Sequence, residues 1–324
     1  MDKNNYHISS VVQSYLEELD YRYQNRGKPL GLSTGIKKLD KQMEWMRNGE
    51  VILLGARPAM GKTSFAVNCS YKLAKTFLET PQNRDCVLYF SLEYSREILL
   101  PRFIAHEIKQ PIWEASYRRY SDVNFEKTYA DFEEVINATK RISELPLYIC
   151  DNLNDVYEME DIIRQVNQQK HVAFIVVDYI QLFSLLEAGN ERAMREIKSL
   201  AQVFNVPILV LSQLNRNLER RKNKRPFSRD IRGGDRKILP YVDKLLFLYR
   251  ESYYLMNEEP EIKSGETQEH FEKRQDEWKK QCKEIENECE IILAKGRYGC
   301  VKCFFDTSTG IFDDLERLED DIPF

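Results

Sequence analysis

Residues 50–64, EVILLGARPAMGKTS, combine an apolar run, a glycine-containing turn and a Gly-Lys-Thr triplet. The apolar run at 51–54 predicts a buried strand, and Gly55, Pro58 and Gly61 end it before a helix begins near Thr63. In such a turn the backbone N–H groups and the positive end of the helix dipole face a bound phosphate. The stretch therefore predicts a strand, a phosphate-binding loop and a helix in this order.

The loop supplies the predicted contacts to a bound nucleotide. These are Ala56, Arg57, Pro58, Ala59, Met60, Gly61, Lys62, Thr63 and Ser64. Lys62 is expected to reach the outer phosphates, and the hydroxyl group of Thr63 is expected to bind Mg²⁺. The usual pattern has a glycine five residues before Gly61, where this chain has Ala56. Alanine fits that position if its φ is negative.

Composition narrows the class of protein. The 324 residues are enough for an α/β core with insertions, as one large domain or two small ones. The net charge of −4 argues against a protein that coats nucleic acid nonspecifically, so any such contact requires a local basic patch. The apolar runs are too short to span a membrane and the first residues lack a signal-peptide core. We therefore expect a cytoplasmic protein without a membrane partner.

Seven cysteines, an odd number in a long chain, do not indicate a disulfide framework. Cys300 and Cys303, with Cys282 and Cys289 upstream, have a spacing that could bind zinc. Residues 300–305 have the pattern of a strand, however, and residues three apart on a strand point to opposite faces. The sequence therefore favours separate cysteines over a zinc site.

Strand-like and helix-like segments alternate from residue 32 to residue 312. The predicted strands are 51–54, 86–92, 147–150, 173–182, 207–211, 244–249, 290–294 and 301–305, and the predicted helices are 64–78, 95–109, 123–143, 158–168 and 190–205. Such alternation is typical of an α/β fold with a mostly parallel, doubly wound sheet, which binds its ligand at the carboxyl ends of the strands.

Three further segments flank or interrupt this pattern. An amphipathic helix is predicted at 9–23, and residues 1–30 form this helix and a Gly/Pro linker. The α/β domain is predicted at 31–313, with a charged insertion at 256–289 that contains a helix at 270–285. Residues 314–324 form an acidic tail. The purpose of the insertion is not evident from the sequence.

Polar residues follow three of the predicted strands. Glu93 could polarise a water molecule against the γ-phosphate, and Asp178 could hold Mg²⁺ directly or through water. Gln213 could sense the γ-phosphate by a hydrogen bond. Each residue alone could cap a strand end. Together with Lys62 and Thr63, they predict a site that hydrolyses a nucleotide.

Six segments carry a resemblance to a known family. They are GLSTGIKKLD (31–40), ARPAMGKTSF (56–65), FSLE (90–93), VDYIQL (177–182), LSQLNR (211–216) and AKGRYG (294–299). In this order they resemble the C-terminal motor domain of DnaB-type replicative helicases, which are RecA-like P-loop ATPases. Alanine at position 56 is common in that family. The resemblance implies a ring, commonly of six subunits, that encircles single-stranded DNA and hydrolyses ATP with Mg²⁺ between adjacent subunits.

The same resemblance suggests which residues act between subunits. Lys295 and Arg297 match a basic pair that reaches into the neighbour's site, although the residues alone also fit a basic turn in solvent. The helix at 9–23 matches the linker helix of the family, which packs on the adjacent subunit. Because few residues precede it, the separate N-terminal domain of the family is expected to be absent.

Residues 216–237 are a basic segment in an otherwise acidic chain. The predicted DNA contacts are Arg216, Arg220, Arg221, Arg229, Arg232, Arg236 and Lys237. These cations could hold a phosphate backbone without reading its sequence, or they could form a solvated loop. Family members usually have Arg-Glu-Ser-Gly leading to Glu-Gln-Asp, whereas this chain has RGGDRKILPYVD at 232–243. This departure leaves DNA contact at the loop open.

The tail residues Glu319, Asp320, Asp321, Ile322, Pro323 and Phe324 resemble the acidic tip by which bacterial single-stranded-DNA-binding proteins recruit replication and repair partners. A solubilising acidic tail is the alternative. Taken together, the motifs predict an ATP-driven DNA helicase motor. The alternatives are a RecA-type DNA-binding ATPase that does not unwind, such as a loader or recombination factor, and a protein that uses nucleotide only as an assembly switch.

Overall fold

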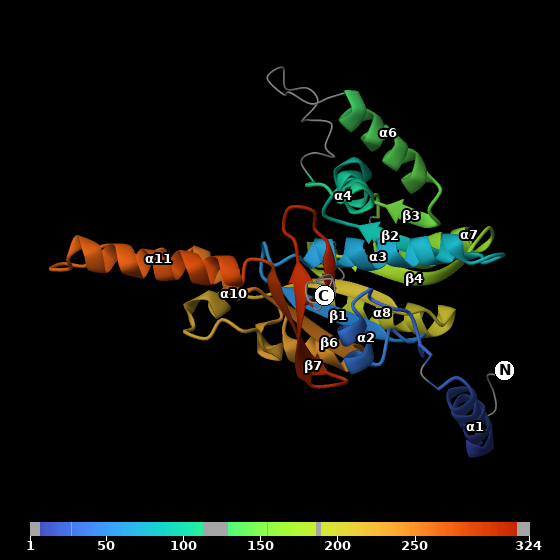
Figure 1. The fold of residues 1–324 in the computed structure, drawn as a ribbon. Coiled ribbons are helices and arrows are strands. Elements are labelled where there is room, and N and C mark those ends of the chain that lie inside the picture. Colours follow the sequence, from blue (N-terminus) through green and yellow to red (C-terminus); the bar gives the residue numbers. More distant parts are fainter. Residues whose placement is uncertain (1–6, 27, 113–128, 154, 186–188, 316–324) are drawn as a thin grey trace.

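The computed structural model describes residues 7–26, 28–112, 129–153, 155–185 and 189–315. In this part of the chain, strands form one sheet in the order β3-β2-β4-β5-β1-β6-β7-β8-β9 (Figure 1). The strands are β1 (Val51–Ala56), β2 (Asp85–Ser91), β3 (Leu147–Cys150), β4 (His171–Asp178), β5 (Ile208–Gln213), β6 (Lys244–Tyr249), β7 (Glu288–Lys295), β8 (Gly299–Phe305) and β9 (Phe312–Asp314). Strands β1 to β6 pair in parallel, and β7, β8 and β9 add antiparallel strands at one side. The predicted mostly parallel sheet is confirmed.

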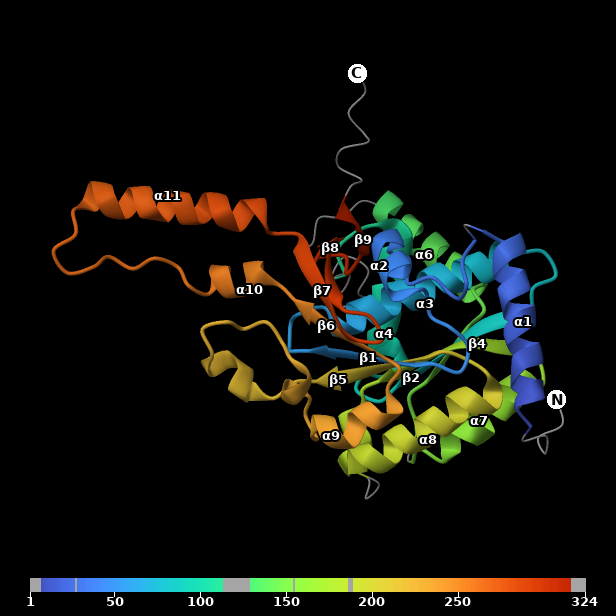
Figure 2. The ribbon, with the colours of Figure 1, turned by 90° about the horizontal axis from the view of Figure 1, so that it is seen from below.

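Helices cover both faces of the sheet. The α-helices of the described ranges are α1 (Ile8–Gln24), α2 (Lys37–Met43), α3 (Lys62–Glu79), α4 (Arg96–Ile108), α6 (Tyr129–Ser143), α7 (Glu158–Asn167), α8 (Gly189–Phe204), α9 (Asp235–Ile238), α10 (Glu251–Met256) and α11 (Gln268–Glu284). Helices α2, α3, α4 and α6 lie over one face, and α7, α8 and α9 lie over the other (Figure 2). Along β1, Ile52 and Leu54 enter the first core while Val51 and Leu53 enter the second. A strand covered on both faces reads as an unbroken apolar run for this reason.

The carboxyl ends of β2, β4, β5 and β1 lie at one edge of the sheet. The registers pair Ala56 with Gln213 and Ser91 with Asp178. Consequently the loop after β1, the segment after β2 and the ends of β4 and β5 come together, although they are far apart in the chain.

The structure differs from the sequence predictions at the end of one strand and in its short elements. The strand predicted at 173–182 ends at Asp178, and a 3₁₀-helix follows at Ile180–Leu185. The short elements α2 and β9 were not predicted, because seven and three residues are too few to show a period. The helix predicted at 123–143 is described from residue 129 onward, where it forms α6.

Helix α1 leaves its apolar side chains exposed. Tyr15 and Tyr23 have 60% and 67% of their surface accessible, and Val12, Leu16 and Leu19 are also exposed. The helix lies at the margin of the α/β domain in both views (Figures 1 and 2). The described part of the chain therefore does not bury the apolar stripe of its own α1.

The charged insertion forms an arm. Helix α11 extends far from the sheet beside α10 and the segment that joins them (Figures 1 and 2). The indole of Trp278 donates a hydrogen bond to the carbonyl of Leu255 at 2.8 Å, and Arg274 pairs with Glu266 at 2.7 Å. These contacts hold α11 to α10 and to the connecting segment. In the described ranges, no helix is long and apolar enough to cross a membrane.

Candidate nucleotide site

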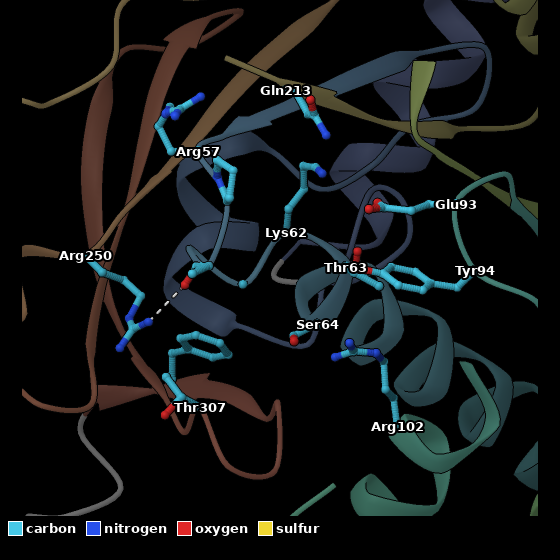
Figure 3. Close-up of a pocket in the computed structure, with 14 residues that line it drawn as sticks. Arg57, Lys62, Thr63, Ser64, Glu93, Tyr94, Arg102, Gln213, Arg250 and Thr307 are labelled. Carbon is cyan, nitrogen blue, oxygen red and sulfur yellow. Dashed lines mark hydrogen bonds between the residues drawn. The ribbon is translucent and has the colours of Figure 1, made fainter. Parts of the chain in front are cut away.

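The turn between β1 and α3 borders a cavity of about 550 Å³ (Figure 3). Residues 57–59 and 61–64 of the predicted nucleotide-binding loop line this cavity. Glu93, which follows β2, and Gln213, which ends β5, line it as well. The cavity therefore joins the loop to two of the three predicted strand-end residues.

Local backbone geometry explains the departure at Ala56. Ala56 is not one of the non-glycine residues with a positive φ angle. Alanine is therefore compatible with this position, which meets the condition stated for it from the sequence. Gly61 has a φ of +93°, and a Cβ atom there would lie 2.6 Å from the Phe305 ring and 3.1 Å from the Phe312 ring. Glycine is therefore needed at position 61, because a side chain there would strain the backbone and would clash with the two rings.

Two of the predicted nucleotide contacts do not line the cavity. Ala56 and Met60 are 1% exposed and belong to the hydrophobic core beneath the loop. Their side chains support the loop from the side opposite the cavity. Arg57 does line the cavity, but its guanidinium is engaged by Glu219 at 2.8 Å and by the carbonyl of Leu214 at 2.8 Å. It links the loop to the segment that follows β5.

Asp178 is fully buried at the end of β4. Its Oδ2 accepts a hydrogen bond from the Tyr89 hydroxyl at 2.9 Å, while Oδ1 has no hydrogen-bond partner within the described ranges. Burial raises the pKa of the Asp178 carboxyl, whereas the charge of Lys62 and the hydroxyl groups of Tyr89 and Thr63 lower it. A buried carboxylate oxygen without a partner, near a threonine hydroxyl, is a donor set that suits a hard cation such as Mg²⁺.

Glu93 lies at the mouth of the cavity, facing the loop (Figure 3). Although the residue is exposed, partial burial of its carboxyl group raises its pKa, and the charge of Lys62 opposes this rise. The negative charge of Asp178 adds to the increase. A carboxylate with a raised pKa beside a phosphate-binding loop can accept a proton from an attacking water.

Sequence reasoning missed several residues of the cavity, among them Arg102, Arg250, Tyr94 and Phe305. Arg102 lies on α4 and faces the loop (Figure 3), one turn after the buried Leu99. A cation on the apolar stripe of a helix was the signal that could have revealed it.

Arg250 supports the loop from the other side. It follows the fully buried strand β6, so the rule that selected Glu93 and Asp178 could also have found it. Its Nη1 donates to the carbonyl of Ala59 at 3.0 Å, and its guanidinium lies 5.3 Å from the centre of the Phe305 ring. Arg250 thereby ties the loop to the Phe305 side of the cavity.

Lys295 and Arg297 do not line the cavity. They lie at the turn between β7 and β8, where Lys295 donates to the carbonyls of Leu239 and Val242 at 2.7 Å and 2.5 Å, and Arg297 pairs with Glu44. More than half of the Arg297 side-chain surface remains exposed. The structure thus separates this basic pair from the nucleotide site of the same chain.

The basic segment is divided between exposed and paired cations. Arg216, Arg220, Arg229, Arg232, Arg236 and Lys237 are exposed. Arg221 is half-buried, and its guanidinium makes a bidentate pair with Asp230 at 3.2 Å and 2.8 Å. Arg221, one of the predicted DNA contacts, is therefore paired with a carboxylate of the same chain, nine residues further along.

Cys300 and Cys303 do not point toward one common site. Cys300 is exposed and Cys303 is buried on the two faces of β8, as the strand pattern predicted, and Cys303 contacts the carbonyl of Cys289 through its thiol. Within the described residues, no group of three or more metal-ligating side chains forms a metal site. The tail motif at 319–324 lies outside the described residues.

A parallel sheet with a Gly-Lys-Thr loop after its central strand defines a P-loop nucleotide-binding fold of the RecA-like class. The chain belongs to the family described as the DnaB-like helicase C terminal domain, whose model matches residues 31–314. A solved structure of a DnaB-like replicative helicase has the same fold, with a TM-score of 0.72, 24% identity and coverage of 97% of this chain and 68% of that one. A separately solved ATPase domain matches with a TM-score of 0.75, 24% identity and coverage of 97% of this chain and 100% of that one.

Curated relatives are similar over most of the chain. The replicative DNA helicase DnaB of Rickettsia bellii is 28% identical over 324 residues, which cover 95% of this chain and 62% of that protein. A probable replicative DNA helicase of Trieres chinensis is 33% identical over 270 residues, 79% of this chain and 56% of that protein. The chain thus spans about three fifths of the length of these relatives.

Proposed function

We propose that this chain is the motor of a DNA helicase that hydrolyses ATP between adjacent copies of itself and translocates on single-stranded DNA. The observation that carries the proposal is the convergence of Lys62, Thr63, Glu93 and Gln213 on one cavity, with the buried Asp178 beside Thr63. Relatives over most of the chain are named replicative DNA helicase, which supports DNA as the track.

Each residue has a role that its position supports. Lys62 binds the outer phosphates, and the backbone N–H groups at the start of α3 face them. Thr63 and Asp178 would hold Mg²⁺, which when bound neutralises charge on the phosphates. Glu93 takes the proton of the attacking water, and Gln213 contacts the γ-phosphate. Arg102 adds a further cation from the same chain at the cavity.

We propose that a neighbouring copy supplies further positive charge at the nucleotide. Lys295 and Arg297 lie outside the cavity of their own chain, and the anchoring of Lys295 to two backbone carbonyls gives the β7–β8 turn a fixed shape. Arg297 then reaches the adjacent nucleotide, where its guanidinium donates to several phosphate oxygens. The exposed stripe of α1 packs on the adjacent copy in the same ring, which we propose has six members.

Complementation between two inactive variants tests the shared site. Lys62→Ala removes the phosphate contact, and Arg297→Ala removes the group offered to the neighbour, so each variant alone is expected to lose ATP turnover while Arg297→Ala retains ATP binding. Mixing the two should restore part of the activity, because some junctions then pair an intact loop with an intact arginine. If Arg297→Ala alone keeps its turnover, the shared site is wrong.

A second candidate, a RecA-type ATPase that binds DNA without unwinding it, is favoured by two features of the basic segment. Gly233 and Gly234 both have positive φ in the loop that departs from the family pattern, and Arg221 is held by Asp230. Strand displacement on a forked DNA separates the two candidates. Turnover stimulated by single strands without displacement would favour the second, and absence of any turnover would favour a nucleotide-dependent assembly protein.

Partner binding through the tail 319–324 is proposed separately from the motor. The resemblance of this tail to an acidic docking tip supports the proposal. Deletion of Ile322, Pro323 and Phe324 should weaken binding to proteins that dock such a tip, and unchanged binding would exclude the proposal.

A further inference from the structure

The amide oxygen of Gln213 is held by Arg232. Arg232 Nη1 donates a hydrogen bond to Gln213 Oε1 at 3.1 Å. A guanidinium has only donors, so the amide oxygen must face Arg232 and the amino group must face away from it. The amide nitrogen points toward Lys62 (Figure 3), whose Nζ lies 4.9 Å from the centre of the Tyr179 ring. Arg232 therefore selects one of the two orientations of this amide.

The backbones of Gln213 and Arg232 are also joined. The N–H of Arg232 donates to the carbonyl of Gln213 at 3.1 Å. The buried side chain of Gln181 accepts from the N–H of Gln213 at 3.0 Å and donates to the carbonyl of Arg232 at 3.1 Å. Leu214 and Ile231 form a β-bridge directly beside these bonds. Arg232 is thus fixed against the end of β5, even though its side chain is exposed.

We propose that Arg232 is a positioning residue that orients the Gln213 amide so that its amino group faces the nucleotide. The inference rests on the proposed contact between Gln213 and the γ-phosphate. Arg232 also belongs to the exposed basic segment, and its Nε and Nη2 make no hydrogen bond within the described ranges. Those donors remain available to a phosphate of single-stranded DNA, so one guanidinium joins the DNA surface to the nucleotide site.

A double-mutant cycle measured without DNA tests the positioning role. Arg232→Ala is expected to lower kcat for ATP about five- to tenfold and to leave KM within about twofold, because one charge-assisted hydrogen bond no longer fixes the amide. In a Gln213→Ala background the same substitution should have no further effect, since the group that it orients is gone. Arg232→Lys, which keeps a donor, should recover part of the loss.

The control is Arg164→Ala, which removes an exposed guanidinium paired with Glu160 on α7, far from the cavity, and should leave kcat unchanged. Melting temperatures of all variants check that they fold. The inference is overturned if the wild type hydrolyses ATP but Arg232→Ala keeps the full DNA-free kcat, or loses the same factor when Gln213 is already alanine. A wild type without any ATP turnover would instead overturn the proposed function itself, and these two outcomes are distinguishable.

Discussion

Substitution of Gly61 by alanine tests how the aromatic residues of β8 and β9 shape the nucleotide loop. The φ of +93° is a left-handed conformation that costs a residue with a side chain about 1–2 kcal/mol. The new methyl group would lie 2.6 Å from the Phe305 ring, which is 3% exposed and stacked on Phe312 with 4.1 Å between ring centres. Phe312 is fully buried, and movement of Phe305 would break its stacking on Phe312, so overpacking adds about 1–3 kcal/mol.

Gly265→Ala provides a control. Gly265 also has a positive φ, +81°, but nothing lies within 4 Å of a Cβ placed there. Only the backbone cost of about 1–2 kcal/mol applies to it. For a chain of this size, a loss of 1 kcal/mol lowers the melting temperature by about 2 °C. We expect a decrease of about 4–10 °C for Gly61→Ala and about 2–4 °C for Gly265→Ala.

Thermal unfolding followed by circular dichroism, together with titration of a fluorescent ATP analogue, measures both effects. Gly61→Ala should also weaken ATP binding, because the loop must shift to admit the methyl group. Phe305→Leu in the same chain removes the nearest ring atoms and should recover part of the lost stability. Melting temperatures within about 1 °C of each other for Gly61→Ala and Gly265→Ala would refute the packing argument.

Two further substitutions give distinct outcomes. Glu93→Gln keeps the shape of the side chain but cannot accept a proton from the attacking water. Phosphate release should therefore fall at least about 100-fold, while ATP affinity stays within about threefold. Retained turnover would exclude Glu93 as the base. His106 is 5% exposed, and burial, together with the charge of Lys72, lowers its pKa from 6.5 to about 4. The unfolded chain therefore binds a proton more readily, and stability falls as the pH decreases from 6.5 toward 4, by about 2 kcal/mol at pH 5. His106→Gln removes this contribution, so its melting temperature should fall less than that of the wild type between pH 7 and pH 5, and parallel curves would show that His106 is not responsible.

The position of the proposed site followed from the sequence because of a property of parallel sheets. Strands of one direction place their carboxyl ends at one edge, so polar residues after apolar runs meet there whatever their separation in the chain. Lys62, Glu93 and Gln213 line one cavity for this reason, and Asp178 lies beside them. The fold class and the helix of the insertion were also predicted, because long periodic segments carry a strong signal.

The contacts of individual cations were decided only by the tertiary structure. Nothing in the local pattern distinguishes Arg221, which is bound by Asp230, from Arg232, which holds Gln213, or from the exposed Arg236. All three lie in one basic segment and look alike in the sequence. A hydrogen bond requires two groups within about 3 Å of each other, so the partner of each arginine depends on which groups the fold brings that close.

Sequence by itself determined which residues follow buried strands, and hence the edge of the sheet where a nucleotide would bind. The folded chain alone decided which side chains meet across that edge, including Arg102 and Arg250 at the cavity and Arg232 at Gln213. The physical reason is range: periodicity and turn chemistry act over a few residues, whereas hydrogen bonds and ring packing depend on positions set by elements far apart in the chain.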